Sequence, residues 1–262
     1  MINSLLPTEK ANIRLLDLGC GNGHALRYIA EAFAVLRPNL NLEFYGLDIY
    51  EMTLTRDYLN AHVPGRPWDS AIVQREPREA WPWQDCYFDV IVSNQVLEHV
   101  MDMDTALVSL HRCLTPDGFS INLFPLKESI IEPHAFMPLV HRVKNEGRRA
   151  ALMGAFTRMG LKKAYRIETS RRGLTSIDDF AATFSHVLTT DTNYLDLSQF
   201  TALTAKHGLK ASFSYTSHYF GAKAASLLKR RTYAYQQPGI AARLLVPICI
   251  RLASATAVLT KM

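Results

Sequence analysis

The chain has 262 residues, is 48% hydrophobic and carries a net charge of +5, so it is long and apolar enough to bury a full core. Its four cysteines lie far apart and form no CxxC pair, which argues against a disulfide framework or a zinc site and favours reduced thiols in the cytoplasm. The first residues lack a basic stretch followed by an apolar stretch and a cleavage site, so we expect no secretion signal.

The positive charge is concentrated towards the C-terminus. No Asp or Glu follows Asp196, and the last 66 residues hold nine of the 29 Lys and Arg residues. The preceding part of the chain is therefore acidic overall. A basic region of this kind either faces an anionic partner, such as a membrane, a phosphorylated substrate or nucleic acid, or keeps the protein soluble.

Short apolar runs alternate with helical patterns through the first half of the chain. We expect strands at 13–18, 42–48, 70–76, 87–94 and 119–125, and helices at 24–36, 50–62 and 103–114. This alternation predicts an α/β fold with an open parallel sheet and helices on both faces. In such sheets ligands bind beyond the carboxyl ends of the strands, at the point where the strand order reverses.

The alternation stops after the fifth predicted strand, which suggests four regions. We expect a cofactor-binding core at 1–125, a helical insertion that caps the substrate at 126–190, the end of the core sheet at 191–238 and an apolar, basic C-terminal helix at 239–262. This last segment is interrupted by Arg243, Pro247 and Arg251. Its uninterrupted apolar stretches are therefore too short to span a membrane. It either lies at a lipid interface or packs on the sheet.

A glycine-rich turn, Asp17-Leu-Gly-Cys-Gly-Asn-Gly23, follows the first predicted strand. Its three glycines suggest that something lies close to the backbone. The turn is tighter than the GxGxxG loop that receives a diphosphate, and the carboxylate before it suits a cationic ligand better. Asp48 ends the second predicted strand, where it either binds ribose hydroxyls or caps the next helix. Its distance from the glycines along the chain favours ribose.

Four stretches, "LLDLGCGNG", "GLDIYE", "FDVIVSNQVLEHV" and "LHRCLTPDGFSINLFP", resemble the successive motifs of class I S-adenosylmethionine-dependent methyltransferases with a UbiE-like core. The resemblance covers about residues 13–125. It implies a Rossmann-like sheet of seven strands, mostly parallel with an antiparallel last strand, and S-adenosylmethionine as cofactor. It also implies the residues that contact the cofactor, namely Asp17, Gly19, Cys20, Gly21, Gly23, Asp48, Ile49, Glu76, Asn94 and Gln95.

The same resemblance assigns these residues to parts of the cofactor. Asp17 and the glycines would line the methionine part, Asp48 would hold the ribose and Ile49 would face the adenine. Asn94 and Gln95 would face the methionine end and the substrate. The family often places an acid after the third strand, near the adenine amino group, but this chain has Pro77 there. Adjacent Glu76 is one substitute, and backbone groups with the Trp81/Trp83 pair are another.

A hydroxyl acceptor of the methyl group needs a base to take its proton, and histidine is the usual choice. His99 in "LEHV" is one candidate, although the family carries this histidine whatever its acceptor, often for packing. Glu132 and His134 in "IIEPHAFMPLVHRV" form a second candidate, which either orients and deprotonates a sugar hydroxyl or is a structural turn. The His and Asp residues of "EHVMDMD" match no firm ligand set, so no metal is predicted.

The insertion and the basic, apolar C-terminus resemble, more loosely, methyltransferases of bacterial surface-polysaccharide synthesis. This resemblance implies O-methylation of a sugar or glycan precursor, phosphorylated or lipid-linked, by a cytoplasmic enzyme peripheral to the inner face of the membrane. The alternatives are an O- or N-methyltransferase of a small metabolite or quinone-like precursor, and a regulator that binds the cofactor without turnover. The segment 142–172 holds ten Lys and Arg residues, but no nucleic-acid-binding motif accompanies them, so no nucleic-acid partner is expected.

Overall fold

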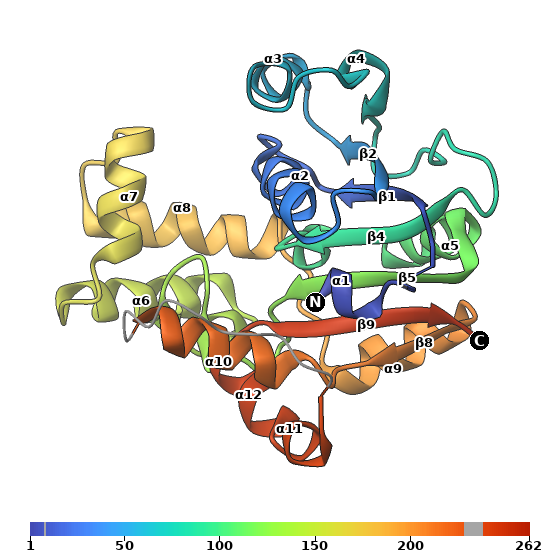
Figure 1. Ribbon diagram of the computed structural model, residues 1–262. Coiled ribbons are helices and arrows are strands. Elements are labelled where there is room, and N and C mark those ends of the chain that lie inside the picture. The colour runs from blue at the N-terminus through green and yellow to red at the C-terminus, as the bar shows by residue number, and fades with distance from the viewer. Residues whose placement is uncertain (8, 228–237) are drawn as a thin grey trace.

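The computed structural model describes residues 1–7, 9–227 and 238–262, and its centre is one seven-stranded sheet (Figure 1). The strand order is β3-β2-β1-β4-β5-β9-β8. The strands are β1 (Asn12–Leu18), β2 (Asn41–Asp48), β3 (Ile72–Gln74), β4 (Phe88–Asn94), β5 (Leu114–Phe124), β8 (Leu209–Ser212) and β9 (Ala255–Lys261). Strands β1 to β5 pair in parallel, whereas β9 is antiparallel to both neighbours. The predicted sheet, with its antiparallel last strand, is confirmed.

Helices cover both faces of this sheet. One face packs against α1 (Ile2–Leu5), α2 (His24–Leu36), α3 (Thr53–His62) and α4 (Trp68–Ala71), and the other against α5 (Met103–Cys113) and α9 (Leu197–Lys206). Helix α2 shows why, because its buried residues Leu26 and Phe33 recur at a helical interval on one side. Two separate apolar cores result, one on each face, as in other doubly wound sheets.

The segment between β5 and α9 forms a helical insertion. It comprises the hairpin of β6 (Ile131–Glu132) and β7 (Met137–Pro138), the short helix η2 (Val140–Arg142), α6 (Glu146–Arg158), α7 (Lys163–Arg172) and α8 (Ile177–Thr190). It has its own apolar core, in which Met137, Met153 and Phe180 are fully buried. Figure 1 shows its three helices beyond the carboxyl ends of β1, β4 and β5. The insertion therefore stands at the edge where ligands of parallel sheets bind.

Residues 239–262 do not form the single C-terminal helix that the sequence predicted. They form two short helices, α11 (Ile240–Leu244) and α12 (Val246–Leu252), which lie beside α10 (Thr216–Leu227), and then strand β9. Residues 255–259 are all buried, because β9 lies between β5 and β8 with both faces covered. A strand buried on both faces has the continuous apolar pattern of a buried helix, which explains the error. Of the helices described here, none is long and apolar enough to cross a membrane.

Two glycines of the turn after β1 are needed for different reasons. Both have positive φ, +71° at Gly19 and +45° at Gly21, a conformation that favours glycine. A methyl group at Gly19 would overlap the side chain of Val96, which follows β4. At Gly21 a methyl group would meet no protein atom within 4 Å. The close neighbour of Gly19 is therefore the protein itself, and only Gly21 borders open space.

Replacing Gly19 by alanine should therefore destabilise the fold by about 2 to 4 kcal/mol, since the unfavourable φ and the overlap with Val96 act together. Gly21→Ala is the matched control, with the same left-handed backbone and no overlap, and should cost only about 1 to 2 kcal/mol. Urea unfolding of both variants measures the difference. In a double-mutant cycle, Val96→Ala should recover part of the loss in Gly19→Ala, and strict additivity would contradict the contact.

Candidate cofactor and acceptor site

The glycine turn and the loop after β4 meet at the carboxyl end of the sheet. Strand β1 pairs with β2 on one side and β4 on the other, which makes this the point where the strand order reverses. The backbone N–H groups of Gly19 and Cys20 donate to the carbonyl of Leu47, at 2.7 and 3.2 Å, and so fix the turn against β2. The turn is thus held by backbone bonds on one side and by Val96 on the other.

Asp48, at the end of β2, ties the glycine turn to its own strand. Its Oδ2 accepts from the Gly21 amide at 2.8 Å, and its Oδ1 accepts from the amides of Ile49 and Tyr50 at 2.7 and 3.2 Å. Helix α3 begins after Met52, so Asp48 does not cap it and that alternative is wrong. The carboxylate is only half-buried and each oxygen can accept a further bond, as ribose binding requires.

Asp17, near the end of β1, is a buried carboxylate with an unused oxygen. The residue is 2% exposed, and its Oδ2 has no hydrogen-bond partner within the described residues. Burial raises the pKa of Asp17 to about 7, and the negative charge of Asp48 adds to this effect. A positively charged ligand would favour the ionised form. The sulfonium and amino groups of S-adenosylmethionine are cationic, so the orphaned oxygen and the open space at Gly21 fit this cofactor.

The other residues assigned to the cofactor differ in what they can offer. Ile49 is 46% exposed beside Asp48, and Asn94 is exposed where β4 ends. The Cys20 side chain is buried against Met52, so only the Cys20 backbone is available to a ligand. The side-chain amide nitrogen of Gln95 donates to the hydroxyl of Ser254, just before β9, at 3.0 Å. This end of the Gln95 side chain is therefore already engaged within the protein.

The region after β3 supplies an exposed acid and no free aromatic face. Glu76 is exposed, and its amide N–H donates to the Glu79 carboxylate at 3.1 Å. Trp81 is 7% exposed in the core, and the Trp83 ring packs 4.9 Å from that of Phe88. Phe88 begins β4, at the opposite end of this strand from the loop that meets the glycine turn, and Arg112 near the end of α5 donates to the backbone carbonyls of both tryptophans. This position does not support the suggestion that the pair binds adenine.

On the acceptor side, the hairpin after β5 holds an acid–histidine pair. Glu132 is fully buried, and its Oε1 lies 2.7 Å from His134 Nδ1 and accepts from the Tyr194 hydroxyl at 2.5 Å. Its other oxygen accepts from the Ala135 amide. Burial alone would raise the pKa of Glu132, but these bonds hold it below its usual value. Burial alone would lower the pKa of His134, but the bond to Glu132 and its charge raise it.

The loop after β4 brings a second acid–histidine pair to the same place. The short helix η1 (Leu97–His99) presents Glu98, which is 1% exposed, and His99. The rings of His99 and His134 meet edge to face with their centroids 5.0 Å apart. The structure thus brings the three predicted catalytic residues, Glu132, His134 and His99, into one cluster.

Sequence reasoning missed two members of this cluster, Glu98 and Tyr194. Glu98 adjoins His99 in "LEHV", and this adjacency of an acid to a candidate histidine was the signal that could have marked it. Tyr194 lies between α8 and α9 in a stretch without a motif. It reaches the cluster because the Asn193 amide donates to the Glu98 carbonyl at 2.6 Å. The Tyr194 ring also packs 5.0 Å from that of His141.

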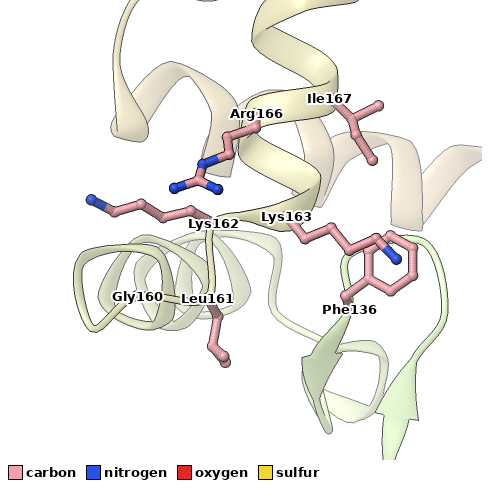
Figure 2. Close-up of a pocket in the computed structure, with 7 residues that line it drawn as sticks. All are labelled: Phe136, Gly160, Leu161, Lys162, Lys163, Arg166 and Ile167. Atoms are coloured by element: carbon pink, nitrogen blue, oxygen red, sulfur yellow. The ribbon is translucent and has the colours of Figure 1, made fainter. Parts of the chain in front are cut away.

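A basic pocket of about 520 Å³ opens beside the hairpin (Figure 2). Lys162, Lys163 and Arg166, from the start of α7, line it together with Phe136 at the hairpin turn. Lys163 Nζ lies 3.7 Å from the centre of the Phe136 ring, whereas Figure 2 shows Lys162 and Arg166 extending to the other side. The arginines of α6 and α7 that form ion pairs with carboxylates are Arg158, Arg171 and Arg172, which do not line this pocket. The pocket thus combines positive charge with apolar walls.

Comparison with known proteins agrees with this geometry. Residues 16–120 match the family described as "Methyltransferase domain". This part of the chain is therefore a methyltransferase domain, and S-adenosylmethionine is the cofactor that its residues fit. A structure titled S-adenosylmethionine dependent methyltransferase from Mesorhizobium loti aligns with a TM-score of 0.50 over 98% of this chain and 94% of its own, at 14% identity. That likeness concerns the fold alone.

Two curated relatives match part of this chain. A malonyl-[acyl-carrier protein] O-methyltransferase of Halorhodospira halophila is 31% identical over 45% of this chain and 37% of its own length. A ubiquinone biosynthesis O-methyltransferase of Ruegeria pomeroyi is 33% identical over 44% of this chain and 43% of its own. The matches thus span less than half of these relatives.

Asp48→Ala should weaken binding of S-adenosylhomocysteine by about 10- to 100-fold, because it removes an acceptor for ribose and releases the Gly21 amide. Calorimetric titration of the wild type and the variant measures the change. Asp57→Ala, a loss of the same charge from an exposed site on α3, is the matched control and should leave affinity unchanged. Equal affinity in Asp48→Ala and the wild type would argue against ribose binding by Asp48.

Proposed function

We propose that this chain is an S-adenosylmethionine-dependent O-methyltransferase whose acceptor is a sugar or glycan precursor. The observation that carries the proposal is the pair of the buried Glu132 and the half-buried His134, whose ring meets that of His99. A hydroxyl oxygen must lose its proton to accept a methyl group, and imidazoles are the groups that assist this near neutral pH. Acceptors that are already anionic would not need such a cluster.

The chain's contribution to the transfer is alignment. The cofactor supplies the methyl group on a sulfonium, so the protein has to hold the acceptor oxygen in line with that carbon. Asp17 and Asp48 would hold the cofactor from the β1 and β2 side. His99 and His134 would hold the acceptor hydroxyl from the other side. The hydrogen bond from His134 Nδ1 to Glu132 fixes the ring and places the lone pair of the neutral imidazole on Nε2, the nitrogen that would take part in the reaction.

The basic pocket supports an acceptor that carries a phosphate. Lys162 and Arg166 offer charge at its mouth, and guanidinium groups bind phosphate oxygens in pairs. The pocket includes Phe136, two residues after His134, so an acceptor could present its hydroxyl to the cluster and its phosphate to the pocket. This arrangement suits a sugar phosphate or a nucleotide- or lipid-linked sugar.

A quinone-like small molecule is the second candidate acceptor. It is favoured by the core match to the ubiquinone biosynthesis enzyme and would use the same cluster on a phenolic hydroxyl. A regulator that binds the cofactor without turnover has less support, because the cluster of buried acids and histidines would then have no purpose.

We also propose contact with the inner face of a membrane through α11 and α12. Ile240, Leu244 and Ile248 are 78%, 74% and 56% exposed there, and Arg243 and Arg251 are exposed between and beside them. Apolar side chains flanked by cations, with no acid in the last 66 residues, are complementary to an anionic lipid surface.

For the transfer itself, we expect His134→Ala to lower turnover by at least about 100-fold while S-adenosylhomocysteine affinity stays within about twofold of wild type. Mass spectrometry of methylated products, with matched phosphorylated and dephosphorylated sugars as acceptors, provides the assay. His186→Ala is the control, because His186 forms a similar pair with Glu146, at 3.1 Å, on the exposed side of α8.

In the same assay, Lys162→Ala/Arg166→Ala should raise KM about 10-fold or more for the phosphorylated sugar only. Lys144→Ala/Arg148→Ala removes the same charge from the exposed start of α6 and should not change KM. Turnover that persists in His134→Ala, or acceptance of no hydroxyl compound at all, would rule out the proposed acceptor chemistry.

For the membrane contact, deletion of residues 239–262 is not a usable test, since it removes β9 from the sheet. Leu244→Glu/Ile248→Glu should instead reduce co-sedimentation with phosphatidylglycerol-containing vesicles at least about 10-fold, because it replaces two apolar anchors by charges. Val35→Glu alters an equally exposed apolar residue on α2 and serves as control. Binding that withstands both the double substitution and high salt would exclude this surface.

A further inference from the structure

Glu98 is a buried carboxylate without a partner. It is 1% exposed, and neither of its side-chain oxygens has a hydrogen bond in the described part of the chain. A carboxylate removed from water without compensation destabilises the folded protein, and a cation bound beside Glu98 would offset this cost.

Two histidines next to Glu98 supply the rest of a ligand set. One carboxylate oxygen of Glu98, one ring nitrogen of His99 and one of His134 all lie within 4.8 Å of one another. Glu98 and His99 come from η1, whereas His134 comes from the hairpin of the insertion. Two imidazoles and one carboxylate are the protein ligands of many catalytic zinc sites, which keep a further position open.

The hydrogen bonds of the two rings fix which nitrogen is free. His99 Nδ1 lies 2.6 Å from the Asp191 carbonyl, which can only accept, so this nitrogen carries the proton. His134 Nδ1 lies 2.7 Å from the Glu132 carboxylate and is likewise the donor. In the neutral form of each ring, the lone pair is therefore on Nε2. Metal-binding histidines are oriented in this way, by a carbonyl or a carboxylate at the other nitrogen.

The cluster places two buried carboxyl groups, those of Glu98 and Glu132, against two imidazoles. Zinc bonds of about 2.0 to 2.1 Å would bring the ligand atoms to about 3.4 Å from one another. His99 is exposed and η1 is a single turn, so a small shift of His99 suffices.

We propose that Glu98, His99 and His134 bind one zinc ion, and that Glu132 positions His134 through its hydrogen bond to Nδ1. The use of this zinc ion in catalysis rests on the proposed function. The acceptor hydroxyl would occupy the open position, where the ion lowers the pKa of the hydroxyl and its proton leaves to water. The oxygen then bonds to the methyl carbon, the carbon–sulfur bond breaks, and sulfur keeps the electron pair. The histidines act as ligands in this scheme, and neither has to serve as the base.

The test is zinc binding by the full chain after removal of metals with a chelator. Titration of Zn²⁺ in competition with a chromophoric chelator should give one ion per chain. Glu98→Gln and His134→Ala should each weaken binding at least about 100-fold, and Glu132→Gln by about 10- to 100-fold. His99→Ala changes an exposed side chain and so remains informative if a buried variant unfolds. Mg²⁺ should not compete, because it prefers oxygen ligands.

His186→Ala is again the matched control and should bind zinc as the wild type does. Absence of stoichiometric zinc, or equal affinity in the wild type, Glu98→Gln and His99→Ala, would overturn the site. Methyl transfer that survives complete removal of zinc would overturn its role in activation. Zinc bound as expected by a protein that methylates no acceptor would support the site and overturn the proposed function alone.

Discussion

The close contact between Gly19 and Val96 joins the two loops from which the site is built. Gly19 lies in the glycine turn that would receive the cofactor, and Val96 lies in the loop that carries Glu98 and His99. The contact is possible because β1 and β4 are parallel neighbours whose carboxyl ends finish side by side. A side chain at Gly19 would push these loops apart. The distance between the glycine turn and the loop of Glu98 and His99 therefore depends on the absence of one side chain.

The buried acids at this edge of the sheet differ in whether their oxygens are hydrogen-bonded. Glu132 is fully hydrogen-bonded, and its pKa stays below the usual value. Asp17 and Glu98 are buried with unsatisfied oxygens, and the pKa of each is raised to about 7. Unsatisfied charge of this kind weakens the folded state once it ionises, and a bound cation offsets the cost. A sulfonium at Asp17 and a metal ion at Glu98 would each supply the missing partner.

The insertion and the C-terminal segment complete the site from distant parts of the sequence. The hairpin of the insertion brings His134 beside His99, and Arg149 fixes α6 to α8 through bonds to Ser185 at 2.9 and 2.7 Å. Strand β9 closes the sheet between β5 and β8, and Ser254 just before it holds Gln95. The apolar residues of β9 are therefore buried in the core, whereas several apolar residues of α11 and α12 are exposed.

The sequence by itself determined the parallel part of the sheet, because strands such as 13–18 and helices such as 24–36 have different hydrophobic periods and end at glycine or proline. It also determined the cofactor turn and Asp48, since these residues are close in sequence to the strands that carry them. Only the tertiary structure decided that residues 255–261 form a strand, because a short apolar run fits a buried strand and a buried helix equally well. The cluster of Glu98, His99 and His134 was also beyond sequence reasoning. Its members lie on segments that no local spacing relates, and they meet only where the hairpin folds back over the end of β4.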